Sequence, residues 1–253
     1  MNNTTLDTIP KLFFNRVDKY KDRVALRKKE FGIWNKITWS QYGLMVRYTG
    51  LGLVSLGLKP EDRVAIMGDS RPEWLYADIG NLSVSGISVG VYTTCSAEEV
   101  KYHLSHSEAR YFIVEDEEQL DKTLEIRDQL PNLTKIIVMD MKGLKHFRDK
   151  MVMSFDQLIQ LGKQFDQDHP GAFEKRLDAT RPDGIATIVY TSGTTGPPKA
   201  ALCSHFNVIS NSIAFAERAA AYDTDVILSY LPLCHIGERS EERRVGKECR
   251  SRW

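Results

Sequence analysis

The chain has few cysteines, and their spacing indicates neither a metal site nor a disulfide framework. Its 253 residues include only four cysteines, at positions 95, 203, 234 and 249. No two of them form C-x-x-C, and no group of Cys, His, Asp and Glu has the spacing of a zinc site. Scattered cysteines of this kind are typical of reduced thiols in a cytosolic protein. We therefore expect no structural disulfide and no zinc.

The chain also lacks a long apolar run, a leader and an excess of charge. No uninterrupted apolar run approaches the about 18 residues of a transmembrane helix. The first seven residues lack the basic start and apolar core of a signal peptide. Lys and Arg number 34, as do Asp and Glu, so no overall field favours nucleic acid. These absences predict a cytoplasmic protein without a transmembrane segment or a nucleic-acid partner.

What the chain does contain is an alternation of strand-like and helix-like segments. Expected strands are 22–27, 31–38, 63–67, 87–91, 109–114, 135–139, 185–190 and 226–231. Expected helices begin near Thr8 and near the predicted cap Ser40, and then cover 71–85, 96–106, 117–129, 154–161 and 204–220. Residues 164–169 are expected to form a polar connection. The alternation predicts an α/β fold with mostly parallel sheets and helices on both faces.

One stretch, residues 185–199, combines a buried strand with a loop suited to an anion. Ile185 to Tyr190 are apolar and β-branched or aromatic, which indicates a strand. Thr191-Ser-Gly-Thr-Thr-Gly196 then alternates hydroxyls with glycines, before Pro197-Pro-Lys199. Glycines let amide N–H groups approach an anion, hydroxyls bind phosphate oxygens or Mg²⁺, and lysine adds a mobile charge. The stretch predicts a phosphate-binding loop, with a plain polar hairpin loop as the alternative.

The common nucleotide-binding loop of P-loop NTPases does not fit these residues. In that loop a lysine follows the second glycine directly, and Ser or Thr comes next. Here Lys199 comes three residues after Gly196, and Ala200 occupies the hydroxyl position. A P-loop phosphotransferase or ATPase is therefore disfavoured. No serine lies in G-x-S-x-G either, so Ser192 is a poor candidate for a hydrolase nucleophile.

Residues 190–199, followed by Leu202-Cys-Ser-His-Phe-Asn207, resemble the signature of the adenylate-forming superfamily of AMP-binding enzymes. This superfamily comprises acyl-CoA synthetases, luciferases and peptide-synthetase adenylation domains. Ala200 departs from the pattern, which usually has glycine there. Residues 230–239, Tyr-Leu-Pro-Leu-Cys-His-Ile-Gly-Glu-Arg, resemble a second signature in the form seen in long-chain fatty acyl-CoA synthetases. Segments 37–42, 57–64 and 72–74 are similar to the same branch.

The resemblance implies a reaction and a set of site residues. A carboxylate attacks ATP to give an acyl-adenylate and pyrophosphate, and CoA then forms the thioester, with Mg²⁺ as the metal ion. The residues implied to bind the phosphates are Thr191, Ser192, Gly193, Thr194, Thr195, Gly196 and Lys199. A hydroxyl of Thr191 or Thr194 would help to order Mg²⁺. Lys199 and His235 are the candidate catalytic residues, His235 at the acyl pocket.

The resemblance covers residues 1–239, as the N-terminal portion of a larger adenylation domain. Later motifs of the family are missing, so we expect this chain alone to be inactive although its parent is an enzyme. Expected partners are a fatty acid, ATP and CoA, and peripheral contact of the parent protein with a membrane stays open. Two alternatives also stay open: an adenylation domain for an amino or aryl acid, and a nucleotide-binding module without catalysis.

Residues 240–253 do not continue the family pattern. From Arg239 to Trp253 the chain holds six basic and three acidic residues and almost nothing apolar. These residues resemble the in-frame translation of a DNA-sequencing adapter. A basic tail that binds nucleic acid or anionic lipid is the alternative. We expect residues 240–253 to be extraneous to the domain, a sequencing artefact.

Genomic sequencing across codon 240 tests this expectation. If the tail is adapter-derived, the genomic reading frame should depart from it there and continue in the adenylate-forming pattern. A genome that encodes residues 240–253 followed by a stop codon contradicts it.

Overall fold

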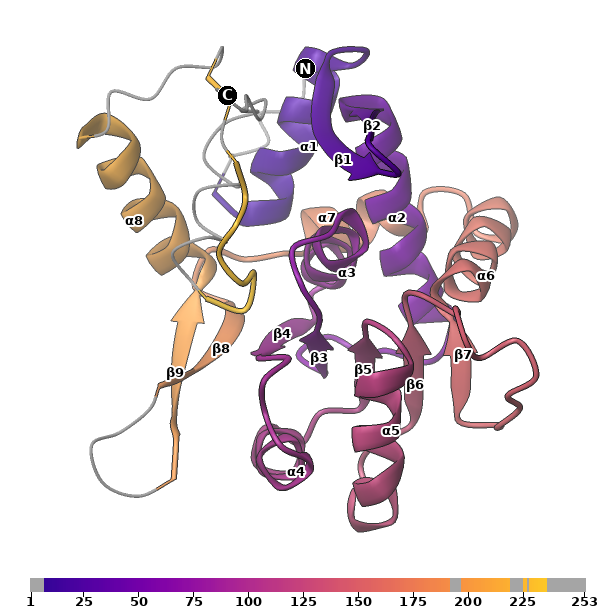
Figure 1. Cartoon of the computed structure of the whole chain (residues 1–253). Helices are drawn as coiled ribbons and strands as arrows, with labels where there is room; N and C mark the ends of the chain where they lie inside the picture. The colour runs from indigo at the N-terminus through magenta and orange to yellow at the C-terminus, as the bar shows by residue number, and fades with distance from the viewer. Residues whose placement is uncertain (1–6, 192–196, 219–224, 227, 236–253) are drawn as a thin grey trace.

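A seven-stranded sheet forms the centre of the molecule, shown by a computed structural model that describes residues 7–191, 197–218, 225–226 and 228–235 (Figure 1). The strand order is β7-β6-β5-β3-β4-β8-β9. All neighbours run parallel except β8 and β9. The strands are β3 (Arg63–Met67), β4 (Ile87–Val91), β5 (Tyr111–Val114), β6 (Lys135–Val138), β7 (Val152–Ser154), β8 (Ile185–Thr191) and β9 (Lys199–Ser204). The predicted fold class is confirmed.

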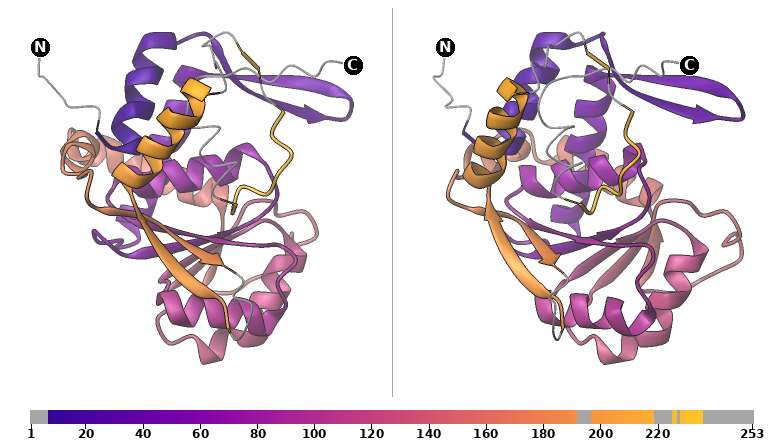
Figure 2. Two further views of the ribbon diagram at one scale, coloured as in Figure 1. Left: turned by 90° about the vertical axis from the view of Figure 1, so that its left-hand side faces the viewer. Right: turned by 60° about the vertical axis from the view of Figure 1, so that its left-hand side comes forward.

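Helices cover both faces of this sheet (Figure 1). One face carries α4 (Ala97–Ser107) and α5 (Glu117–Ile126), the latter extended by a 3₁₀ turn, Arg127–Gln129. The other carries α1 (Ile9–Tyr20), α2 (Trp39–Ser55), α3 (Pro72–Ser83), α6 (Phe155–Asp168) and α7 (Ala172–Asp178). The last helix, α8 (His205–Arg218), follows β9 beside α1 (Figure 2).

The sheet separates two hydrophobic cores because side chains alternate along each strand. In β3, Val64 and Ile66 join the core beneath α2 and α3. Ala65 and Met67 join the core beneath α4 and α5. All four residues are fully buried. A parallel strand covered on both faces is apolar along most of its length, as β3 is after Arg63, which is why its residues predict a strand clearly.

Helix α2 packs against its neighbours through glycine. A Cβ on Gly162 of α6 would overlap the carbonyl oxygen of Tyr48, and one on Gly80 of α3 would lie 2.9 Å from the carbonyl oxygen of Val46. The backbones of α2, α3 and α6 therefore approach closely, and no larger residue fits at these crossings without moving a helix.

A separate two-stranded ribbon, β1 (Val24–Glu30) and β2 (Ile33–Thr38), extends from this body (Figure 2). The strands are antiparallel, and Glu30 pairs with Ile33 across a two-residue turn. The turn residues, Phe31 and Gly32, have φ of 48° and 82°. The two strands expected here are thus present, joined by a turn at Phe31 and Gly32.

Two helix boundaries differ from the sequence predictions. Thr38, and not Ser40, caps α2: its hydroxyl accepts from the Gln41 amide while the Gln41 side chain accepts from the Thr38 amide. Helix α6 continues to Asp168 and includes most of the predicted polar connection 164–169. Its buried residues already face α2, so its polar C-terminal turns extend the helix with their side chains toward solvent.

The prediction of a strand at 226–231 is wrong for those of its residues that the structure describes. Residues 226 and 228–231 have no strand conformation, and Leu228 and Tyr230 are exposed. An apolar run forms a strand only where a neighbouring strand offers hydrogen-bonding groups, and the described residues offer none here.

At the first helix, Thr8 occupies the cap position but its side chain makes no capping bond. Its hydroxyl lies 2.9 Å from that of Thr180 instead.

Gly162→Ala tests the contact between α2 and α6. Alanine favours helix by about 1 kcal/mol over glycine, yet its methyl group has no space against Tyr48. We expect the free energy of unfolding to fall by about 1–3 kcal/mol in urea denaturation. Gln160→Ala, on the exposed face of the same helix, is the control and should change it little. A Gly162→Ala protein as stable as the wild type contradicts the close packing.

Candidate adenylate site

The predicted phosphate-binding loop connects β8 to β9, which form an antiparallel hairpin. Thr191 and Lys199 are the last pair of its register, so they face each other where the loop leaves the strands. The Thr191 hydroxyl is 3.4 Å from the Lys199 carbonyl oxygen, and both residues are exposed. The other predicted loop residues, Ser192, Gly193, Thr194, Thr195 and Gly196, lie outside the described residues. Thr191 and Lys199 therefore lie opposite each other at the two ends of the loop.

The hairpin is attached to the sheet through β4. Ser88 pairs with Thr187, and Val89 with Ile188. The Thr187 hydroxyl donates to the Ser88 carbonyl at 2.9 Å in a buried position. Ala200 pairs with Tyr190 as an ordinary strand residue without positive φ, so this position has no need of glycine.

Helix α4 supports both ends of the loop. The Tyr102 hydroxyl donates to the Pro198 carbonyl at 2.8 Å, just before β9. The Tyr190 hydroxyl, just before the loop, is 2.9 Å from Nδ1 of His106, and its ring centroid is 4.4 Å from that of His103. Burial raises the pKa of the Tyr190 phenol to about 12, so it remains protonated at neutral pH. The segments entering and leaving the loop are thus fixed to one helix.

His235 is placed by the two residues before it. Leu233 is fully buried in the core and Cys234 is 5% exposed. A Cβ on Gly90 of β4 would lie 2.9 Å from Cα of Cys234, so the chain can cross β4 only over a glycine. His235 itself is exposed, with its amide donating to the Pro232 carbonyl at 2.9 Å. His235 therefore follows a segment that crosses β4, the strand paired with β8, and its role at an acyl pocket stays a prediction.

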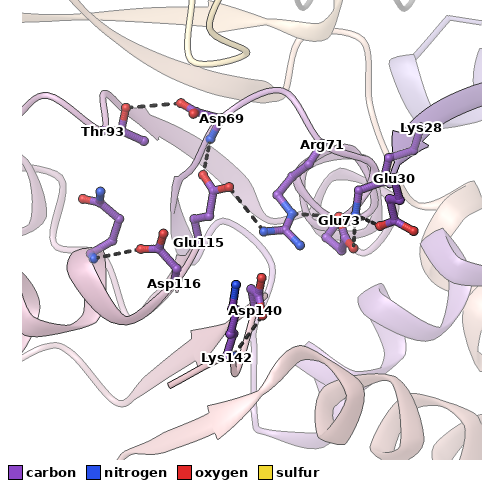
Figure 3. Close-up of polar contacts among 11 residues, drawn as sticks. Lys28, Glu30, Asp69, Arg71, Glu73, Thr93, Glu115, Asp116, Asp140 and Lys142 are labelled. Atoms are coloured by element: carbon purple, nitrogen blue, oxygen red, sulfur yellow. Dashed lines mark hydrogen bonds and ion pairs between the residues drawn. The ribbon is translucent and has the colours of Figure 1, made fainter. Parts of the chain in front are cut away.

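A polar network that the sequence analysis did not identify joins the loops at the carboxyl ends of β3, β4 and β5 (Figure 3). Glu115 accepts from the Asp69 amide at 2.6 Å and from Arg71 at 3.3 Å. Arg71 also bonds Glu73 at 2.8 Å, and Thr93 lies 3.4 Å from Asp69. These loops lead to helices on opposite faces of the sheet.

The charges of this network largely satisfy one another. Although burial opposes ionisation of Glu73, the hydrogen bond and charge of Arg71 lower the pKa of its carboxyl below the usual value. The Arg71 side chain is only 13% exposed. The network therefore rigidifies the loops beside the candidate site. It could have been anticipated, because Asp69, Thr93 and Glu115 each follow a predicted strand by one or two residues, where polar side chains gather in open parallel sheets.

The structure adds two observations on metals and membranes. Among the residues it describes, no group of three His, Cys, Asp or Glu side chains could hold a metal ion. Of the two hydroxyls predicted for Mg²⁺, Thr191 is described and Thr194 is not. No helix in the described part of the chain is long and apolar enough to cross a membrane.

Comparison with known proteins identifies a matching family and several relatives. The family of AMP-binding enzymes matches residues 13–242. Long-chain-fatty-acid–CoA ligase ACSBG2 of Xenopus laevis is 36% identical over 233 residues, which are 90% of this chain and 31% of that protein. ACSBG1 of Homo sapiens is 34% identical over 243 residues, 94% of this chain and 33% of that protein. The chain thus spans about a third of the length of these relatives.

Solved structures share the fold at lower identity. Acetoacetyl-CoA synthetase from Streptomyces lividans superposes with a TM-score of 0.80 at 18% identity, covering 96% of this chain and 38% of that one. The anthranilate CoA ligase AuaEII, in complex with anthranoyl-AMP, gives 0.79 at 21% identity, covering 96% and 44%. The family match ends three residues beyond Arg239, in a part that the structure does not describe, so the extraneous tail stays a prediction.

Tyr102→Phe tests the attachment of the loop to α4. The variant keeps the ring but removes the donor to the Pro198 carbonyl. We expect the free energy of unfolding to fall by about 0.5–1.5 kcal/mol. Tyr48→Phe is the matched control, since the hydroxyl of this half-buried tyrosine has no hydrogen-bond partner among the described residues. Equal effects of the two substitutions in urea denaturation argue against a specific role of the Tyr102 hydroxyl.

Proposed function

Because the chain belongs to the family of AMP-binding enzymes, we propose that it is part of an ATP-dependent acid–thiol ligase for a long-chain fatty acid. The activity is that of the whole protein, of which this chain supplies one part. The β8–β9 hairpin carries the proposal, because it brings Thr191 and Lys199 together at the two ends of a glycine- and hydroxyl-rich loop. The names of the curated relatives support the choice of acid.

In the first proposed step a carboxylate oxygen of the acid attacks the α-phosphorus of ATP. A bond forms from that oxygen to phosphorus, the bond to the bridging oxygen breaks, and pyrophosphate leaves with the electron pair. A protein accelerates such a step mainly by positioning the reactants and offsetting charge. Residues 191–196 would bind the β- and γ-phosphates, and Lys199 would offset the charge that develops on pyrophosphate.

In the second proposed step the CoA thiolate attacks the acyl carbon and AMP leaves. No pyrophosphate is present at this stage, so Lys199 has little to do. His235 would line the acyl channel, a role supported by the approach of the preceding Cys234 to Gly90 of β4, the strand paired with β8.

Mg²⁺ enters the proposal as the ion that accompanies the phosphates of ATP. Magnesium is usually held by one or two protein oxygens together with substrate phosphates and water. The exposed Thr191 hydroxyl fits such a contribution. Thr194 is the other candidate, and the described residues add no carboxylate cluster.

The choice between a fatty acid and another carboxylate does not follow from the fold, since an anthranilate CoA ligase shares it. Residues 230–239 favour the fatty-acid branch. Acid-dependent exchange of pyrophosphate into ATP by the complete protein distinguishes the alternatives. A long-chain fatty acid should support exchange better than an aryl or amino acid. If none of these acids supports exchange, the result favours the alternative of a nucleotide-binding module without catalysis.

Lys199→Ala in the complete protein tests the role of the loop. A lost charge-assisted bond to phosphate costs roughly 1.5–3 kcal/mol. Adenylation, measured by pyrophosphate exchange, should therefore slow by about ten- to a hundredfold. Thioester formation from preformed acyl-adenylate should change much less. Lys199→Arg should restore only part of the rate, because guanidinium spreads the charge that ammonium concentrates.

Lys163→Ala is the matched control, because this exposed lysine lies on α6 in another part of the molecule. It should leave both half-reactions unchanged. Equal loss of both half-reactions in Lys199→Ala would assign Lys199 to folding or to the acyl and CoA sites. Loss of neither would show that the loop is only a turn.

A further inference from the structure

The β1–β2 ribbon ends in a tip with exposed apolar side chains. Phe31 is 105% exposed, Ile33 68% and Trp34 42%. Every residue from Lys29 to Lys36 is exposed. Figure 2 shows the ribbon projecting beyond the body of the molecule, with this turn at its far end.

The conformation of Phe31 is not explained by folding. Its φ of 48° places a bulky side chain in the left-handed region, at the first position of a two-residue turn. Asn, Asp or Gly is preferred there, because the Cβ of a bulkier residue is strained in the left-handed region. Packing would offset that cost if the ring were buried, but it is fully exposed. An exposed aromatic residue at a strained turn indicates a role outside the folded chain.

Lysines surround the apolar tip. Residues 28–36 contain three lysines and one glutamate. Lys28 is paired with Glu30 and Glu73, whereas Lys29 and Lys36 form no ion pair with a described residue. The Lys29 ammonium lies 5.9 Å from the Trp34 ring centroid, and these two residues pair across the strands. Lys36 pairs with Arg27 on the same face, so like charges lie directly opposite each other.

We propose that the tip of this ribbon, residues 29–36, inserts into the surface of a membrane that contains anionic lipid. Phe31 and Ile33 would enter the acyl boundary. Trp34 would lie at headgroup level, as tryptophan does at membrane interfaces, with Lys29 and Lys36 against lipid phosphates. Neighbouring like charges are unfavourable in the free protein and favourable against an anionic surface. The proposal does not depend on the catalytic activity proposed above.

A membrane fits this surface better than a protein partner does. A stable protein interface covers roughly 800 Å² on each side, more than three side chains on a convex turn can provide. Lipids reorganise around a projecting tip, and insertion of a few apolar residues beside basic ones is the usual balance of peripheral binding. Helix α8 also exposes Phe206 and Ile213, but on the regular face of a helix that lies along the body.

Flotation of the full chain with vesicles tests the proposal, because lipid-bound protein rises while aggregated protein sediments. The wild type should float with vesicles of phosphatidylcholine and phosphatidylserine, and less with phosphatidylcholine alone. Phe31→Asn should lower the apparent affinity by about tenfold. The same variant should be at least as stable to urea as the wild type, because asparagine suits the turn.

Two further variants complete the test. Lys29→Gln with Lys36→Gln should weaken binding to anionic vesicles roughly twentyfold and leave binding to phosphatidylcholine unchanged. Leu44→Gln removes an exposed apolar side chain from α2 and should leave flotation unchanged. A wild type that floats with no vesicle overturns the proposal. So does a Phe31→Asn protein that floats as the wild type does, or that loses stability, since the ring would then serve the fold.

Discussion

The geometry of the candidate site depends on a short parallel pairing between β4 and β8. Two residue pairs join the strands, and the buried hydrogen bond from Thr187 to Ser88 accompanies them. This register decides which residues of β8 reach the edge of the sheet, since a shift by one residue would turn every side chain to the opposite face. On the same strand β4, the bare backbone of Gly90 lets Cys234 approach. The β8–β9 hairpin and the segment before His235 therefore both adjoin β4.

The hairpin is fixed at both of its ends. At the loop end, α4 bonds Pro198 through Tyr102. At the base, the Ile9 amide lies 3.4 Å from Nδ1 of His205, and Lys11 donates to the Thr180 carbonyl at 2.9 Å. These contacts join segments more than 160 residues apart in sequence. The strand ends beside the loop are therefore held in place before any ligand binds, and preorganisation is the main contribution that a protein makes to phosphoryl chemistry.

Most of the fold could be predicted from the sequence, because strands such as Arg63–Met67 are buried and apolar from their second residue onward. Errors arose where tertiary contacts decide. Thr38 and Ser40 are equally good caps by residue type, and the position of α2 selects Thr38. The run 226–231 is strand-like in composition but lacks a pairing partner among the described residues. The loop stands out in the sequence because its residue types are unusual, whereas the support from α4 does not, since it consists of ordinary residues brought together by folding.

We propose that residues 191–199 contact the phosphates of ATP in the complete protein. A crystal structure of the complete protein with a non-hydrolysable ATP analogue and Mg²⁺ tests this contact. The loop amides and hydroxyls should surround the β- and γ-phosphates, and the Lys199 ammonium should lie within hydrogen-bonding distance of a phosphate oxygen. A nucleotide bound with its phosphates away from the β8–β9 hairpin would contradict it.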